Sequence, residues 1–123
     1  MRSPGEPSVR RDADHFRMHA EICKVLTDPK RLMLLDALRG GARSVGDLAA
    51  TIGASLPNVS QHLGVLRAAG LVEGRKAGTT VFYELAEPEI VTACDVIDRI
   101  VGRRHEQPSP PVSAGQPLAS VSR

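Results

Sequence analysis

The 123-residue sequence lacks any stretch that approaches the roughly 18 consecutive apolar residues needed to span a membrane. The first residues also lack the long apolar segment of a secretion signal. There is no Ser/His/Asp order, glycine-rich phosphate loop or paired-acid pattern of the kinds that mark active sites. These absences indicate a cytoplasmic protein that is not an enzyme, and Asp28 and Asp47 are better interpreted as helix caps.

The sequence also has little net charge. Its formal charge of +2 comes from the two ends, because residues 12–106 carry 12 positive and 13 negative side chains. Net charge therefore does not indicate a nucleic-acid partner, and only the placement of the charges can do so.

Length and composition predict one small domain. A chain of 123 residues with 41% hydrophobic content can form one core but scarcely two. We expect residues 12–106 to fold, between a disordered arm (1–11) and a disordered tail (107–123) that contains four prolines. A partner subunit is expected to add stability.

Cap residues and apolar periodicity predict the helices. The first runs from Asp12 or Asp14 through Leu26, and the second from Asp28-Pro29 to Gly40-Gly41. Ser44 caps a third, which carries Val45, Leu48, Ala49 and Ile52 on one side and stops at Gly53. The last helix has Pro88 in its first turn and an apolar stripe from Ile90 to Val101.

Just after Gly53, a further helix is predicted from the cap residue Ser55 to Ala69, with Gly70 following it. At about 100° per residue, one side is expected to be buried. That side holds Leu56, Val59, Leu63 and Leu66, whereas Pro57, Ser60, Gln61, Gly64 and Val65 face away. His62 lies near the apolar side, where packing or a local hydrogen bond is favoured over metal binding.

An alternating segment then predicts a β-hairpin. The strands are Leu71–Arg75 and Thr80–Leu85, joined by a loop over Lys76–Thr79, and Val81, Tyr83 and Leu85 share a face. Two helices joined at Gly53 and followed by a hairpin are the order of a winged helix-turn-helix. The expected fold is therefore mainly helical with a small β-hairpin, and the expected partner is double-stranded DNA.

The helix after Gly53 is the candidate recognition helix, because its outward face is small and uncharged enough to enter a major groove. Gln61 can pair with adenine, and Gly64 permits close approach. Positive charge near the hairpin is placed to contact phosphates. The candidate DNA-binding residues are Ser55, Leu56, Pro57, Asn58, Ser60, Gln61, Gly64, Arg67, Arg75, Lys76 and Thr79; alternatively, they form an ordinary solvated surface.

Four motifs, in this order and spacing, resemble the ArsR/SmtB family of bacterial repressors over roughly residues 12–102. They are residues 25–32 (VLTDPKRL), 44–48 (SVGDL), 57–63 (PNVSQHL) and 69–72 (AGLV), followed by Gly78-Thr79 and Tyr83. The resemblance implies a homodimer joined by the first and last helices. It also implies an imperfect palindromic operator, because a two-fold dimer presents two recognition helices.

Apolar residues suit both of those helices to a dimer interface. Phe16, Ala20, Cys23 and Leu26 lie on the first, and Ile90 to Val101 on the last. By contrast, the family's better-known sensor sites are not matched. Residues 44–47 (SVGD) stand where the arsenic and cadmium sensors carry their thiolate site. Ile100 and Arg103 stand where the pattern of the zinc sensors needs ligands in addition to Glu87 and Glu89. Asp36 stands in place of the second-helix cysteine of the sulfide-responsive branch.

The two cysteines, Cys23 and Cys94, are the remaining candidates for an inducer site. If their Cα atoms lie within about 7 Å, they can form a disulfide or a sulfur-bridged link, or bind a thiophilic ion. His15 and His19 lie on the same side of the first helix as Cys23, which offers a metal-binding row. No cofactor is required by the sequence. The alternative is a DNA-binding dimer without an inducer, in which the cysteines are small buried hydrophobic residues.

Overall fold

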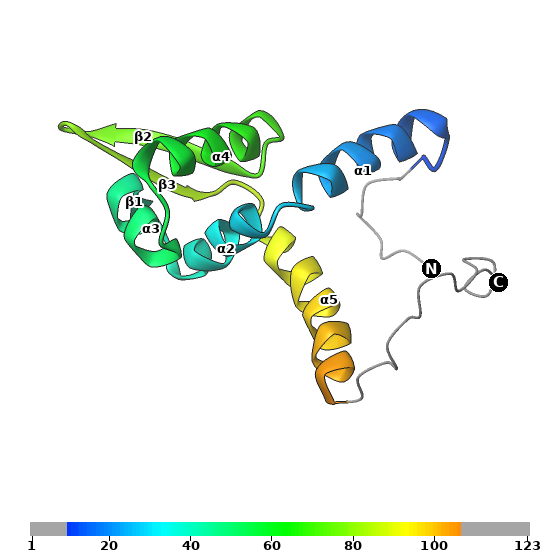
Figure 1. Ribbon diagram of the computed structural model, residues 1–123. Coiled ribbons are helices and arrows are strands. Elements are labelled where there is room, and N and C mark those ends of the chain that lie inside the picture. Colours follow the sequence, from blue (N-terminus) through cyan, green and yellow to red (C-terminus); the bar gives the residue numbers. More distant parts are fainter. Residues whose placement is uncertain (1–9, 107–123) are drawn as a thin grey trace, which may run out of the picture. The chain divides into compact units, whose positions relative to one another are not determined.

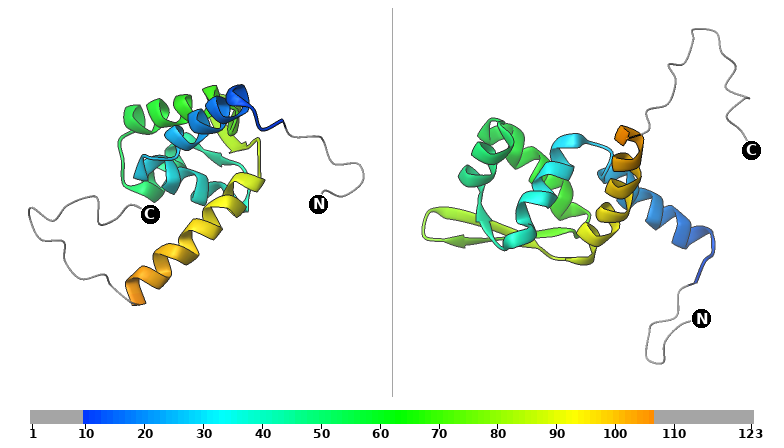
Figure 2. Two further views of the ribbon diagram at one scale, coloured as in Figure 1. Left: turned by 90° about the vertical axis from the view of Figure 1, so that its right-hand side faces the viewer. Right: turned by 90° about the horizontal axis from the view of Figure 1, so that it is seen from below.

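The structure is a computed structural model that describes residues 10–106 (Figures 1 and 2). Its elements are α1 (Ala13–Val25), α2 (Pro29–Ala37), the 3₁₀ turn η1 (Leu38–Gly40), β1 (Arg43–Ser44), α3 (Val45–Ile52), α4 (Leu56–Ala68), β2 (Val72–Ala77), β3 (Thr80–Leu85) and α5 (Glu89–Glu106). The mainly helical fold with a small antiparallel sheet is therefore confirmed. The predicted tail, and the predicted arm except Arg10 and Arg11, lie outside the described residues.

Backbone contacts divide the chain into two units, of which the first ends at Val91 and the second begins at Thr92. The first unit contains α1 to α4 and the sheet, and the second contains the greater part of α5. The prediction of one domain over residues 12–106 stays a prediction.

Four of the predicted caps, Asp12, Asp28, Ser44 and Ser55, are confirmed, and each begins a helix by satisfying N–H groups that the first turn leaves without partners. The Asp12 and Asp28 carboxylates accept from His15 N–H (2.9 Å) and Lys30 N–H (2.8 Å). Ser44 Oγ accepts from Asp47 N–H at 3.1 Å, and Ser55 Oγ accepts from Asn58 N–H at 3.3 Å. These bonds are local in sequence, which is why sequence patterns predict them.

The core of the first unit is formed by α2, α3, α4 and the start of β2. Its buried residues are Leu34, Leu35, Leu38, Leu48, Ala49, Ile52, Val59, Leu63, Leu66, Leu71 and Val72. No residue of α1 is buried, and only Val25 and Leu26, at its end, pack against this core. The core therefore fixes α3 and α4 and leaves most of α1 exposed.

The sheet has the order β1-β3-β2, and both pairings are antiparallel. The two-residue strand β1 was not predicted; in it Arg43 lies opposite Tyr83 and Ser44 opposite Phe82. The predicted loop was too long, because Lys76 and Ala77 belong to β2 and only Gly78 and Thr79 form the turn. Gly78 makes this turn with a φ of 67°, a conformation that glycine adopts without strain.

Helix α5 carries large apolar residues that the chain itself leaves exposed. Ile90 and Val91, which belong to the first unit, pack at the edge of its core. Val96, Ile97, Ile100 and Val101 of the second unit are between 42% and 56% exposed. Within residues 10–106, no helix is long and apolar enough to cross a membrane.

Candidate nucleic-acid interface

Helices α3 and α4 are joined by a short turn at Gly53. This glycine ends α3 in the left-handed conformation with a φ of 68°, and Ala54 N–H then donates to Ala49 O at 3.1 Å. Ser55 follows at once as the cap of α4. The sequence therefore builds a helix-turn-helix with α4 as its second helix.

One side of α4 is anchored in the core. Val59, Leu63 and Leu66 are completely buried, as predicted. Leu56 was expected on the same buried side, and that prediction is wrong, because its side chain is 55% exposed. Helical periodicity places Leu56 on the same side as Val59, but Leu56 is the first residue of α4 and lies one turn before Val59, the first residue of the helix that reaches the core. It joins the exposed candidates instead.

The predicted DNA-binding residues on α4 are presented to solvent, with one exception. Ser55, Leu56, Pro57, Ser60, Gln61, Gly64 and Arg67 are exposed. Asn58 is half-buried, and its Oδ1 is a buried oxygen without a hydrogen-bond partner among the described residues. The exposed surface from Leu56 to Gly64 carries no charged side chain, which suits direct contact with base edges rather than with phosphates.

Val65, which was predicted on the outward side of α4, is exposed, and it lies beside α1. It lines an apolar groove of about 480 Å³ together with Ala68 and Ala69 of α4 and with residues of α1. The α1 residues are Met18, Glu21, Ile22 and Val25.

The hairpin projects beyond α3 and α4, which is where a wing would meet a nucleic-acid backbone (Figures 1 and 2). Arg75, Lys76 and Thr79 are exposed, as predicted. Arg75 and Lys76 are neighbours in β2, so their side chains point to opposite faces of the sheet. Lys76 shares a face with Tyr83, whereas Arg75 lies opposite Phe82 on the other face.

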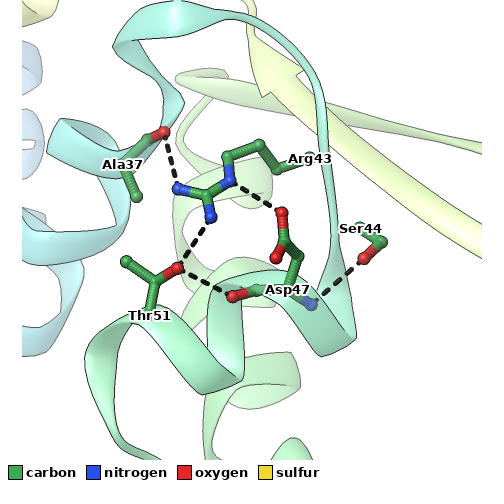
Figure 3. Close-up of polar contacts among 5 residues, drawn as sticks. All are labelled: Ala37, Arg43, Ser44, Asp47 and Thr51. Atoms are coloured by element: carbon green, nitrogen blue, oxygen red, sulfur yellow. Dashed lines mark hydrogen bonds and ion pairs between the residues drawn. The ribbon is translucent and has the colours of Figure 1, made fainter.

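A network around Arg43 fixes α3, the first helix of the motif (Figure 3). Its Nε donates to Asp47 Oδ2 at 3.0 Å, and its Nη2 donates to Thr51 Oγ1 at 2.7 Å. Its Nη1 donates to Ala37 O at 3.4 Å, at the end of α2. Asp47 was interpreted as a cap, but its carboxylate binds Arg43 and its N–H is the group capped by Ser44. One guanidinium thus joins three elements, a role for which sequence spacing gave no signal.

A second cluster holds α4 against the start of α2. His62 is only 13% exposed, and its Nδ1 lies 3.3 Å from Arg31 Nη1. Its Nε2 lies 3.9 Å from Asp28 Oδ1, the atom that caps α2. His62 therefore bonds locally, as expected, and is part of the support of the helix rather than of its outward face.

The cluster shifts the pKa of Asp28. Partial burial raises this pKa, but hydrogen bonds from the backbone N–H groups of Arg31 and Lys30 lower it. The positive charge that His62 carries when its ring is protonated and the charge of Arg31 lower it further, so the pKa of Asp28 lies below the ordinary value of 3.8. The Asp28 carboxylate is accordingly stabilised in its charged form.

The predicted inducer residues lie on the two outer helices. Cys23 is exposed on α1, and Cys94 is half-buried on α5. The rings of His15 and His19 lie edge to face, with centroids 6.1 Å apart. Within residues 10–106 of one chain, no three His, Cys, Asp or Glu side chains gather closely enough to hold a metal ion. The row of His15, His19 and Cys23 is thus not a complete metal site in one chain.

Known proteins resemble this chain in sequence and in structure. A helix-turn-helix domain family matches residues 26–75. The HTH-type transcriptional regulator Rv0081 of Mycobacterium tuberculosis is 37% identical over 89 residues, which cover 72% of this chain and 78% of the relative. Its crystal structure has a TM-score of 0.68 and 34% identity, and covers 77% of this chain and 96% of that one.

Two further relatives extend the match. The biofilm growth-associated repressor of Xylella fastidiosa is 36% identical over 109 residues, 87% of this chain and 96% of the relative. A homodimeric winged helix-turn-helix DNA-binding domain of Mycobacterium bovis, a possible ArsR-family regulator, has a TM-score of 0.64 at 30% identity and covers 90% of this chain and 100% of that one. The chain belongs to the ArsR/SmtB family.

As a member of the ArsR/SmtB family, the chain is a winged helix-turn-helix transcriptional regulator, in which α4 is the second helix of the motif and the β2–β3 hairpin is the wing. Sequence reasoning identified both elements. It did not single out Arg31 and Arg43, the two arginines that hold the helices of the motif, because their partners lie on other elements of the fold.

Proposed function

We propose that two copies of this chain form a cytoplasmic repressor that binds a palindromic operator and is released by an agent that reacts with thiols. The observation that carries the proposal is the exposed, uncharged surface of α4, opposite a face that is completely buried. A rigid helix with such a surface is what direct reading of the major groove needs. Gln61 and Ser60 are the proposed base-reading residues.

Dimerisation is supported by apolar residues that the single chain leaves in water. On α1 these are Phe16, Met18 and Ile22, and on α5 they are Val96, Ile97, Ile100 and Val101. Two faces of this kind on a small domain are typical of a subunit interface. The relative from M. bovis is described as homodimeric.

Release is proposed to act through Cys23 and Cys94, because each lies on a helix with an exposed apolar face. The thiolate form of cysteine attacks an oxidant or the sulfane sulfur of a persulfide, and it is the form that binds a thiophilic ion such as arsenite. A change at either thiol would alter the dimer and reduce its fit to the operator by a coupling of a few kcal/mol. The alternative is a DNA-binding dimer without an inducer, in which both cysteines only pack.

Fluorescence anisotropy with DNA from upstream of the protein's own gene tests the proposal. The reduced protein should bind this DNA tightly and with strong salt dependence, and random DNA of equal length more weakly. Addition of oxidant, persulfide or arsenite in separate samples should release the operator. Separate samples with zinc and with nickel test whether metal binding at the row of His15 and His19 changes DNA binding.

Single substitutions assign the response. Cys23→Ser and Cys94→Ser should each keep operator binding and lose the release by at least one of these agents. Wild-type binding that none of these agents changes would favour the alternative, and release that persists in both variants would overturn the assignment to Cys23 and Cys94. Equal affinity for upstream and random DNA would contradict operator recognition itself.

A further inference from the structure

We propose that Arg31 is a positioning residue for DNA recognition: it links the end of α1 to the recognition helix and holds α4 in its DNA-reading orientation only while His62 is neutral. This inference rests on the proposed role of α4. It concerns three elements of the first unit, α1, α2 and α4, and the side chain that connects them.

The first link joins Arg31 to α1. Arg31 Nε donates to Val25 O at 2.6 Å. Val25 is the last residue of α1, where carbonyl groups lack partners within the helix and where positive charge is favoured by the helix dipole. Arg31 therefore ends α1 with a charge-assisted hydrogen bond, which is stronger than a bond between neutral groups.

The second link joins Arg31 to α4. Arg31 Nη1 lies 3.3 Å from His62 Nδ1. Because a guanidinium can only donate, Nδ1 must accept, and it can do so only when it carries no proton. The proton of the neutral ring is then on Nε2, which points to Asp28 Oδ1 at 3.9 Å. His62 is thus held between an arginine and a carboxylate of α2.

The position of His62 gives this cluster its functional consequence. His62 directly follows Ser60 and Gln61, which are exposed on the outward face of α4. A small movement of His62 moves its helical neighbours with it, and base contacts depend on their placement to a fraction of a hydrogen-bond length. Contacts of Arg75 or Lys76 with phosphates do not depend in this way on the bridge that Arg31 forms between α1 and α4.

Protonation of His62 would exchange its partners. The charged groups that face the ring are Arg31 and Asp28, both at the start of α2. A protonated ring cannot accept from Arg31 and is repelled by it, but it is attracted to the Asp28 carboxylate. The bridge from α1 to α4 would then be broken while His62 remains bound to α2.

The test compares affinity for the upstream DNA with affinity for random DNA of equal length. Arg31→Gln and Arg31→Lys should each lower this ratio about tenfold, because lysine keeps the charge but cannot reach both partners at once. Lys30→Gln is the matched control, since it removes a neighbouring charge and leaves the bridge intact. It should leave the ratio unchanged.

The variant His62→Asn tests whether the affinity ratio depends on pH through His62, a dependence that a purely structural role would not produce. Asparagine Oδ1 stands at the position of His62 Nδ1 and accepts a hydrogen bond at any pH. In the wild type the ratio should fall on acidification, because a protonated imidazole cannot accept the hydrogen bond from Arg31. In His62→Asn it should stay constant, although His15, His19 and His105 are present in both proteins.

The outcomes separate the two proposals. If the wild type does not distinguish upstream from random DNA, the proposed function is wrong and this inference fails with it. If the wild type does distinguish them but both Arg31 variants behave like Lys30→Gln, the inference alone is overturned. A pH response in His62→Asn equal to that of the wild type would overturn the role of His62. Unfolding in urea is measured for each variant, and Arg31→Lys and His62→Asn keep the test valid if Arg31→Gln does not fold.

Discussion

Gly74 of β2 lies directly opposite Tyr83 of β3, and the tyrosine ring occupies the space that a side chain at position 74 would need. A Cβ atom built on Gly74 would lie 3.0 Å from two atoms of that ring. Tyr83 packs against the hydrophobic core from this position. The pair therefore connects the wing to the body of the domain.

We expect Gly74→Ala to destabilise the protein by about 1–3 kcal/mol, because the tyrosine ring or the strand must move to accept a methyl group. Gly46→Ala is the control, since a Cβ there meets nothing within 4 Å and α3 gains a better helix former. Urea unfolding measures both. A Gly74→Ala variant as stable as the wild type would show that the ring moves without cost.

The outer face of the wing contains an unfavourable charge pair. Glu73 and Glu84 are opposite each other in the β2–β3 register, and like charges at directly opposed positions destabilise a sheet. Glu73→Gln should therefore stabilise the protein by about 0.2–1 kcal/mol at low salt. Glu87→Gln, an exposed position outside the strands, is the control and should have no such effect. Thermal unfolding at two salt concentrations checks this, because salt should reduce the gain.

The lowered pKa of Asp28 predicts how acid affects stability. A carboxyl whose pKa is lower in the folded than in the unfolded state stabilises the fold above the unfolded value. That contribution decreases as the pH falls below 3.8 and through the lower folded pKa. Asp28→Asn keeps a cap oxygen but cannot titrate. It should be less stable than the wild type near neutral pH, with a difference that shrinks in acid.

Urea unfolding of both proteins across the acid range measures this difference. A constant difference at every pH would mean that the charge of Asp28 contributes nothing and that only the shape of the cap matters. The prediction is independent of DNA binding, so it can be tested on the free protein.

Sequence patterns predicted the elements of the motif well because the signals are local. The four caps are made within three residues of the helix they begin, and the glycine turns are fixed by the φ angles of single residues. The buried face of α4 follows from helical periodicity. The order of two helices and a hairpin predicted the winged helix-turn-helix, and the family motifs agreed with it.

What the patterns missed depends on contacts between distant segments. Strand β1 is two residues long and exists only because β3, nearly 40 residues later, pairs with it. By the helical count Leu56 lies on the buried side of α4, but it is exposed because the core does not extend to the first residue of that helix. Arg31 and His62 are 31 positions apart, so no local spacing could connect them.

We expect α4 to contact base edges and the wing to contact phosphates. Gln61 is exposed on the uncharged surface of α4, and Lys76 is exposed near the tip of the hairpin. Gln61→Ala should cost about 1–3 kcal/mol on the upstream DNA and little on random DNA, because only base contacts carry sequence information. Lys76→Gln should weaken binding to both DNAs alike and reduce the slope of log affinity against log salt by about one, because it removes one phosphate contact. Anisotropy titrations at several salt concentrations separate the two effects, and equal losses on both DNAs for Gln61→Ala would refute its base-reading role.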